Sequence, residues 1–177
     1  MRKMLAIAGV TLGVMAGASA LSADSRAPSD SSFNARITHY MALRRQVEQR
    51  VPAPRISDNR AEIHGAADAL AEAIRRARSH DARGDIFSAK IAADFRRIIQ
   101  TVAKTAPRAV RVRDARPTVN SRFDWDLDAD MPALLIQALP PLPPELQYRL
   151  VGCDLVLVDI VAGLVIDILP AALADGC

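Results

Sequence analysis

The sequence predicts an α+β domain in which three to four helices pack on a small C-terminal antiparallel β-meander. Three observations predict this class: short apolar runs near the C-terminus, turn residues between those runs, and apolar stripes of helical period in the middle of the chain. Half of the 177 residues are hydrophobic, which is enough for the core of one domain. We expect this domain to span residues 33–173, with a short tail at 174–177.

The meander is predicted from its strand-forming residues and its turns. The expected strands are Tyr148–Val151, Leu155–Val158 and Leu164–Leu169. Gly152 stands at the first central position of a two-residue turn, where a type II′ turn requires positive φ. The second turn is longer and ends on Gly163, which suits a left-handed closing residue. Connections this short exclude parallel crossovers, so the strands are expected to be antiparallel.

Both faces of the expected sheet are apolar. Val156 and Val158 point to one face, and Leu155 and Leu157 point to the other. A half-solvated sheet would alternate polar and apolar residues, so we expect both faces to be covered. The chain's own helices would cover one face, and a further helix or a partner subunit would cover the other.

Two aspartates interrupt this apolar segment. We expect Asp159 to open the second turn through its side chain, and Asp167 to lie at an edge or to pair with Arg149. A catalytic carboxylate pair is the alternative interpretation, and we favour the structural one.

The N-terminus has the three parts of a secretory signal peptide over residues 1–20. Residues 2–3 are basic, residues 4–17 are apolar, and residues 18–20 form an A-x-A cleavage signal. Residues 21–32 are rich in Ser, Ala and Asp and are expected to be a disordered linker. These features predict a periplasmic or secreted protein with no membrane span after signal cleavage.

Charge gives little support to a nucleic-acid partner. The formal net charge is +3, and removal of Arg2 and Lys3 with the signal peptide leaves 3 − 2 = +1. We therefore expect no nucleic-acid binding. An oxidising compartment would permit a disulfide between Cys153 and Cys177, the only two cysteines. Free or intermolecular cysteines are the alternative, because one cysteine is in a tight turn and the other is the last residue.

Four helical segments are expected before the meander. They are residues 33–50; a helix from a cap at Ser57 or Asp58 to about His80; one from a cap at Ser88 to about Lys104; and one from a cap at Asp130 to Leu139. The position of the basic residues within 75–80 is explained by the partial negative charge at the C-terminal end of the helix dipole. Residues 107–122 are basic and irregular and are expected to form an exposed crossing loop.

One acidic stretch could supply oxygen ligands to a hard cation such as Ca²⁺. Its aspartates are Asp124, Asp126, Asp128 and Asp130. The calcium-loop pattern requires Gly at its sixth position and Glu at its twelfth, where this chain has Ala129 and Leu135. The match fails, so we expect an acidic surface loop whose last aspartate caps a helix.

No other motif in the sequence indicates a catalytic or ligand-binding site. His39, His64 and His80 are scattered and form no helical metal pair, and Asp68 is the best local partner of His64. The sequence has no Gly-rich phosphate loop, nucleophile elbow or C-x-x-C motif. We therefore predict no catalytic, cofactor-binding or metal-binding residues. The expected function is that of a non-enzymatic binding protein with a protein or envelope partner, and with a homodimer through the meander as one form.

Two segments resemble an uncharacterised family of exported bacterial proteins. The first is ARGDIFSAKIAADFRRII, where GDIF precedes a capped helix that ends in F-R-R; the second is LPPLPPELQYRLVGCDLVLVD. The sequence departs from the family pattern at Cys153, where a basic residue is usual, and at residues 161–163, where a more polar turn is common. This resemblance implies export and transfers no functional residue.

The last thirty or so residues are similar to the terminal hairpin of small periplasmic proteins related to nickel/cobalt-efflux regulators. The shared pattern is Y-R-x-V-G-x-D-x-x-L-x-D-x-x-x-G-L-x-x-D-x-L. This resemblance implies an alternative function, a periplasmic modulator of metal homeostasis.

Overall fold

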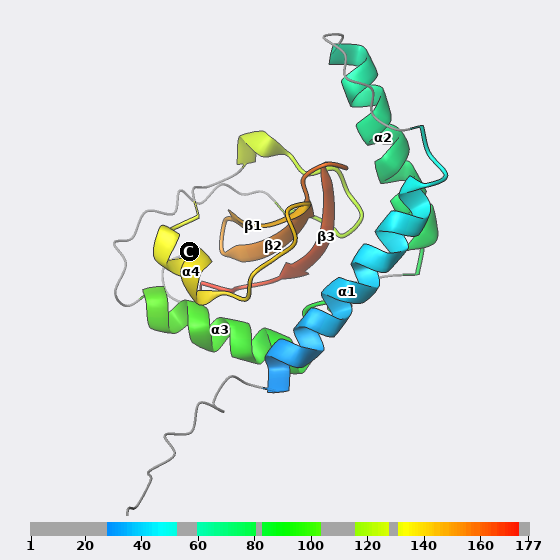
Figure 1. Cartoon of the computed structure of the whole chain (residues 1–177). Helices are drawn as coiled ribbons and strands as arrows, with labels where there is room; N and C mark the ends of the chain where they lie inside the picture. The colour runs from blue at the N-terminus through cyan, green and yellow to red at the C-terminus, as the bar shows by residue number, and fades with distance from the viewer. Residues whose placement is uncertain (1–27, 53–59, 81–82, 104–115, 128–130, 174–177) are drawn as a thin grey trace, which may run out of the picture.

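The fold is the α+β arrangement that the sequence predicts, with helices around a C-terminal three-stranded sheet (Figure 1). The structure is a computed structural model that describes residues 28–52, 60–80, 83–103, 116–127 and 131–173. Its elements are α1 (Pro28–Glu48), α2 (Arg60–Ala77), α3 (Ala89–Ala103), the 3-10 turn η1 (Trp125–Leu127), α4 (Ala133–Ala138), β1 (Leu146–Val151), β2 (Asp154–Asp159) and β3 (Leu164–Leu169). Among the helices in these ranges, none combines the length and the apolar composition of a membrane-spanning segment.

The sheet is a meander with the strand order β1-β2-β3, and both pairings are antiparallel. Gly152 has φ 58° at the first central position of the β1–β2 turn, as a type II′ turn requires. Gly163 has φ 60° at the end of the β2–β3 turn, so it is the left-handed closing residue that the sequence predicts. A β-bulge between Leu157 and Val158 shifts the register and places Asp167 opposite Leu157.

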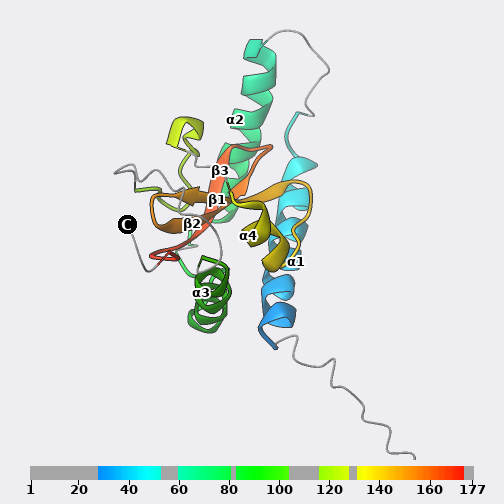
Figure 2. The ribbon, with the colours of Figure 1, turned by 90° about the vertical axis from the view of Figure 1, so that its left-hand side faces the viewer.

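Helices cover one face of the sheet, and the larger hydrophobic core lies between them (Figures 1 and 2). Leu155 and Leu157 of β2 contribute to this core and are fully buried. Four aromatic rings from separate elements meet there: Phe33, Phe87, Phe95 and Tyr148, with centroids 5.0–6.4 Å apart. Burying a side chain of this kind stabilises the fold by about 1.5–3 kcal/mol, so this cluster ties α1 and α3 to the sheet.

The second face of the sheet is also buried, within the single chain. Val156, Val158 and Val165 are fully buried there and belong to a smaller core cluster that includes Phe123. The expectation that both faces are covered is confirmed. The expected cover, a further helix or a partner subunit, was wrong, because Phe123 and the partly buried Val119 come from an irregular segment of the same chain.

The same irregular segment pairs with the outer edge of β3 near its start. Asn120 donates its backbone N–H to Val165 O over 2.9 Å, Phe123 donates to Gly163 O, and Val165 donates back to Ser121 O. Residues 120–123, here called the edge segment, therefore extend the ladder without forming a full strand. The described part of the exposed crossing loop expected at 107–122 is irregular and exposed or half-buried, and its end also pairs with β3; residues 104–115 lie outside the described residues.

Several helix limits differ from those expected. Helix α1 begins at Pro28, so residues 28–32 of the expected linker are helical, and Pro is favoured in a first helical turn. Helix α2 ends at Ala77, before the expected end near His80, and α3 starts directly after Ser88, as expected. Pro132, not Asp130, occupies the N-cap position of α4, and no side-chain cap is present there. The caps expected at residues 57–58 and the residue Asp130 lie outside the described residues.

Candidate functional site

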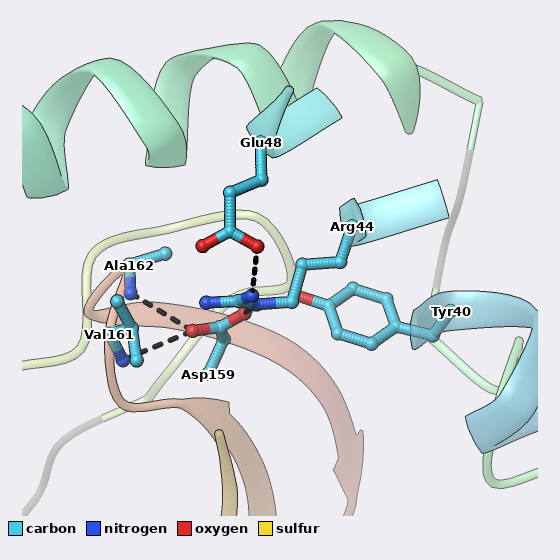
Figure 3. Close-up of polar contacts among 6 residues, drawn as sticks. All are labelled: Tyr40, Arg44, Glu48, Asp159, Val161 and Ala162. Atoms are coloured by element: carbon cyan, nitrogen blue, oxygen red, sulfur yellow. Dashed lines mark hydrogen bonds and ion pairs between the residues drawn. The ribbon is translucent and has the colours of Figure 1, made fainter. Parts of the chain in front are cut away.

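The most concentrated polar arrangement in the described residues surrounds Asp159, which is fully buried at the end of β2 (Figure 3). Its Oδ1 accepts the backbone N–H groups of Val161 and Ala162 at 3.1 and 2.9 Å. This is the side-chain turn that the sequence predicts for Asp159, and it fixes the chain reversal between β2 and β3.

The other carboxylate oxygen of Asp159 binds two side chains of α1. Oδ2 accepts a hydrogen bond from the Tyr40 hydroxyl at 2.8 Å and one from Arg44 Nε at 2.7 Å. Arg44 also donates from Nη1 to Glu48 at 2.9 Å, one turn further along α1 (Figure 3). Tyr40, Arg44 and Glu48 follow one another at four-residue spacing, so one stripe of α1 presents all three groups to the turn.

Burial and the carboxylate together set the protonation of this cluster. Burial raises the pKa of Tyr40 well above its ordinary value, and the charge and hydrogen bond of Asp159 raise it further. Burial alone would lower the pKa of Arg44, but the charge and hydrogen bond of Asp159 outweigh that effect and raise it. Tyr40 is therefore a neutral donor and Arg44 a permanent cation.

A second buried arginine lies beside this cluster. Arg78 is 2% exposed, its guanidinium lies 5.3 Å from the centroid of the Tyr40 ring, and it donates to Ile166 O at 3.1 Å. It also exchanges hydrogen bonds with Asn120 of the edge segment, in both directions at 3.2 Å. Arg78 therefore joins the end of α2 to β3 and to the edge segment, a larger role than the helix-dipole explanation gave it.

Asp167 is the second fully buried carboxylate, and backbone amides surround it. Oδ2 accepts the N–H groups of Ile86 and Phe87, both at 2.7 Å, and Oδ1 accepts those of Gly84 and Ile168 at 2.9 and 2.7 Å. Gly84 has φ 94°, a conformation that glycine adopts without steric cost. Asp167 lies on the edge strand β3, one of the two positions expected for it, and it binds the loop before α3 and not Arg149.

The two buried aspartates have used all of their hydrogen-bond acceptor sites. Each carboxylate accepts four hydrogen bonds, which is the number of lone-pair sites that its two oxygens offer. A general base or a metal ligand needs a lone pair directed at its substrate or ion. These carboxylates therefore fix the turn and the loop, and the geometry supports the structural interpretation over the catalytic pair.

The other candidate residues are dispersed on the surface. Asp124 and Asp126 are exposed, and Asp124 accepts the backbone N–H of Asp126 at 3.0 Å, so this part of the acidic stretch is a surface loop as expected. Asp128 and Asp130 lie outside the described residues. Within the ranges that are described, no three His, Cys, Asp or Glu side chains are grouped to hold a metal ion.

The histidines and cysteines add no further cluster. His39, His64 and His80 are all exposed. Asp68 forms an ion pair with Arg122, not the expected contact with His64. Cys153 is disulfide-bonded, and Cys177 lies outside the described residues.

Sequence reasoning missed Arg44 and the partners of Arg78, although one signal was present. Arg44 falls within the apolar stripe of α1, which continues through Ile37, Met41 and Val47. A cation at a core-facing position requires a buried anion, because an unpaired buried charge is very costly. That rule predicts a partner for Arg44, but it does not identify Asp159, which is 115 residues away.

A surface hollow lies beside β1 in the part of the chain that the structure describes. The hollow has a volume of about 500 Å³, and it lies along residues 146–149, with α4 and residues 140–142 as further walls. Its lining residues are Met131, Ile136, Pro140, Pro141, Leu142, Leu146, Gln147, Tyr148 and Arg149. Leu134 and Ile136 of α4 are large aliphatic side chains that are 52% and 56% exposed, and Ile136 is the one that lines the hollow.

Comparison of the chain with family models, with curated proteins and with solved structures finds no match. Function must therefore be argued from the chain itself. The two family resemblances remain predictions.

Proposed function

We propose that this chain is a non-enzymatic interaction protein of the bacterial envelope, exported to the periplasm or beyond, and that it binds another protein through α4 and the hollow beside β1. One observation carries the proposal: Ile136, which lines the apolar hollow, exposes more than half of its surface. Water contact at such side chains is unfavourable by about 25 cal/mol per Å², so their burial by a partner would stabilise a complex.

The character of the hollow supports a protein partner. Aliphatic and proline side chains form most of its lining, and Gln147 and Arg149 supply polar groups at one side. An apolar centre with a polar margin is the usual composition of a protein–protein contact. The saturation of both buried aspartates supports the non-enzymatic part of the proposal, because neither carboxylate offers a lone pair to a substrate.

Site-specific photo-crosslinking in the living host tests this surface. A photoreactive residue at Ile136 should give a discrete protein adduct, whereas the same residue at Arg76 should give none. Arg76 is a suitable control because its side chain is 69% exposed and α2 lies on the opposite side of the sheet from α4 in Figure 1. Equal adducts at the two positions, or none at either, would contradict the proposed surface.

Export has a separate test. The proposed signal peptide predicts a mature chain that begins at Leu21 and that fractionates with the periplasm or the medium. Mass spectrometry of the protein purified from its host measures both properties at once. A chain that retains Met1 and stays in the cytoplasm would exclude the envelope location.

The alternative function, a periplasmic modulator of metal homeostasis, remains a proposal that one titration can test. It predicts heat on addition of Ni²⁺, Co²⁺ or Ca²⁺ to the purified protein, and loss of that heat in an Asp124→Asn, Asp126→Asn variant or a His64→Gln variant. Absence of heat with all three ions would remove it.

A further inference from the structure

A proline-rich segment joins α4 to β1. Residues 139–144 have the sequence L-P-P-L-P-P, so each residue from 139 to 143 is a proline or precedes one. Proline fixes φ at about −65°, and a residue before proline is restricted to an extended ψ of about 120–160°. Leu139 has φ −82° and ψ 154°, close to the values of a polyproline II helix. The segment is therefore a short polyproline II helix up to the turn that begins at Pro143.

The exposure of this segment follows the three-residue period of a polyproline II helix. Pro141 and Pro144 are exposed, and they are three positions apart. Leu139 and Leu142 have the same spacing, and they pack on the larger core. The rings of Pro141 and Pro144, here called the proline ridge, therefore face outward, and Pro141 also lines the hollow.

The backbone of the segment is bound on its inner side only. The Tyr148 hydroxyl donates to Pro140 O at 3.1 Å, and Leu146 donates its N–H to Pro143 O at 3.0 Å in the turn before β1. The carbonyl of the exposed Pro141 accepts no hydrogen bond from the described residues. A polyproline II helix has no internal hydrogen bonds, so this carbonyl is an acceptor for a donor from outside the segment.

We propose that the partner at the hollow is a different protein that takes up the proline ridge in a groove of aromatic side chains, one of which enters the hollow. The inference rests on the proposed function, because it names the chemistry of the partner at the same surface. Polyproline II segments are bound in aromatic-lined grooves, because they are ordered before binding and lose little conformational entropy. Here the core contacts of Leu139 and Leu142 also hold the segment in place.

The hollow suits an aromatic side chain that donates a hydrogen bond. Its volume is about 500 Å³ and its lining is mostly apolar, and an aromatic side chain buries roughly 150–250 Å². Ile136 lines the hollow and is 56% exposed, so the same ring would cover it. A buried indole N–H needs an acceptor, and the carbonyl of Pro141, which lines the hollow, supplies one.

The aromatic residues of this chain do not form such a groove for a second copy. They are one Trp, two Tyr and four Phe, and all lie in the described ranges. The Tyr and Phe side chains are all buried. Trp125 is 46% exposed, but its ring packs edge-on against Phe123 and lies under the guanidinium of Arg149. The groove must therefore belong to another protein.

Methyl NMR of the full chain tests the hollow, with N-acetyl-tryptophanamide as the probe for the partner's aromatic side chain. At millimolar probe concentration, the ring current should shift the methyl signals of Ile136 and Leu142. Val161, which is 42% exposed and does not line the hollow, is the matched control and should not shift. N-acetyl-leucinamide should bind at least about tenfold more weakly, and the 1-methyl form of the tryptophan probe, which lacks the N–H donor, should also bind more weakly. Equal shifts with the leucine probe, or none with the tryptophan probe, would overturn the inference.

A substitution in the proline ridge tests the same contact in the host. Pro141→Ala removes an exposed ring, so it should weaken binding of the tryptophan probe about fivefold and reduce the protein adduct from a photoreactive residue at Ile136 by a similar factor. Pro52→Ala is the matched control, because Pro52 is exposed after α1 and does not line the hollow. It should change neither measurement, and circular dichroism establishes that each variant is folded.

The results separate the two proposals. A protein adduct from Ile136 that persists in Pro141→Ala, without binding of the tryptophan probe, would overturn the aromatic groove and leave the interaction surface standing. Selective binding of the probe without a protein adduct would place a small aromatic ligand in the hollow and overturn the protein partner in both proposals. Absence of both signals would also overturn both.

Discussion

Replacement of Asp159 by Asn should destabilise the protein strongly, although the two side chains are nearly equal in size. The amide retains one oxygen and replaces the other with an NH₂ group, so two of the four hydrogen bonds are lost in either orientation. Arg44, which is 2% exposed, also loses its buried counter-charge. Breaking a buried ion pair costs about 3–5 kcal/mol.

The expected loss lies near the lower limit, about 3 kcal/mol, because Glu48 stays 2.9 Å from Arg44 Nη1. The side chain of Glu48 is 41% exposed, so it compensates only in part. Since domains of this size are stable by about 5–15 kcal/mol, such a loss is readily measured by urea denaturation followed by circular dichroism. Asp126→Asn, in the exposed loop, is the control and should change the free energy of unfolding by less than about 0.5 kcal/mol.

A double-mutant cycle separates the ion pair from the turn. Arg44→Met should also destabilise, and the combination with Asp159→Asn should cost less than the sum of the single changes by about 0.5–3 kcal/mol. A cost below about 1 kcal/mol for Asp159→Asn, or strict additivity in the cycle, would refute the conclusion that α1 is held to the β2–β3 turn by this pair.

Two further predictions concern the neighbouring polar groups. In a Tyr148→Phe background, where Tyr40 is the only tyrosine, no phenolate absorbance should appear until the protein unfolds. Because the pKa of Tyr40 is raised in the folded protein, its contribution to the free energy of unfolding is fully present below about pH 10 and falls above it by up to about 1.4 kcal/mol per pH unit. Titration of the folded phenol near pH 10 would contradict this. Asp167→Asn should cost about 1–3 kcal/mol, because two of the four backbone amides lose their buried acceptor, and hydrogen exchange measured by NMR should accelerate at Gly84 and Ile168 or at Ile86 and Phe87; unchanged exchange at all four amides would show that the loop is held by other contacts.

Much of the fold could be predicted because its determinants are local. The glycines at 152 and 163 fix the two turns, and the apolar runs between them fix the strands, so sequence alone predicts the meander and its direction. The period of apolar residues predicts the helices in the same way. The limits of α4 and the start of α1 were less accurate, since short helices and first turns depend on tertiary contacts that local patterns do not contain.

The polar network could not be predicted because each of its contacts joins distant parts of the chain. Asp167 was expected near Arg149, but its position depends on a one-residue bulge, which turns a strand residue to the other face and which no sequence pattern marked. Likewise, Val119 and Phe123 lie in a segment without periodicity, so nothing in the sequence associated them with the second face.

The contact between Arg44 and Asp159 also constrains the order in which the chain can fold. The three longest helices precede the sheet in sequence, yet Arg44 of α1 and Arg78, directly after α2, donate to Asp159 and Ile166, within the last twenty residues of the chain. Until those residues are available, a packed helical layer would contain uncompensated charge, which opposes its formation. The N-terminal four-fifths of this protein should therefore remain open during synthesis and become compact only when the final hairpin joins it.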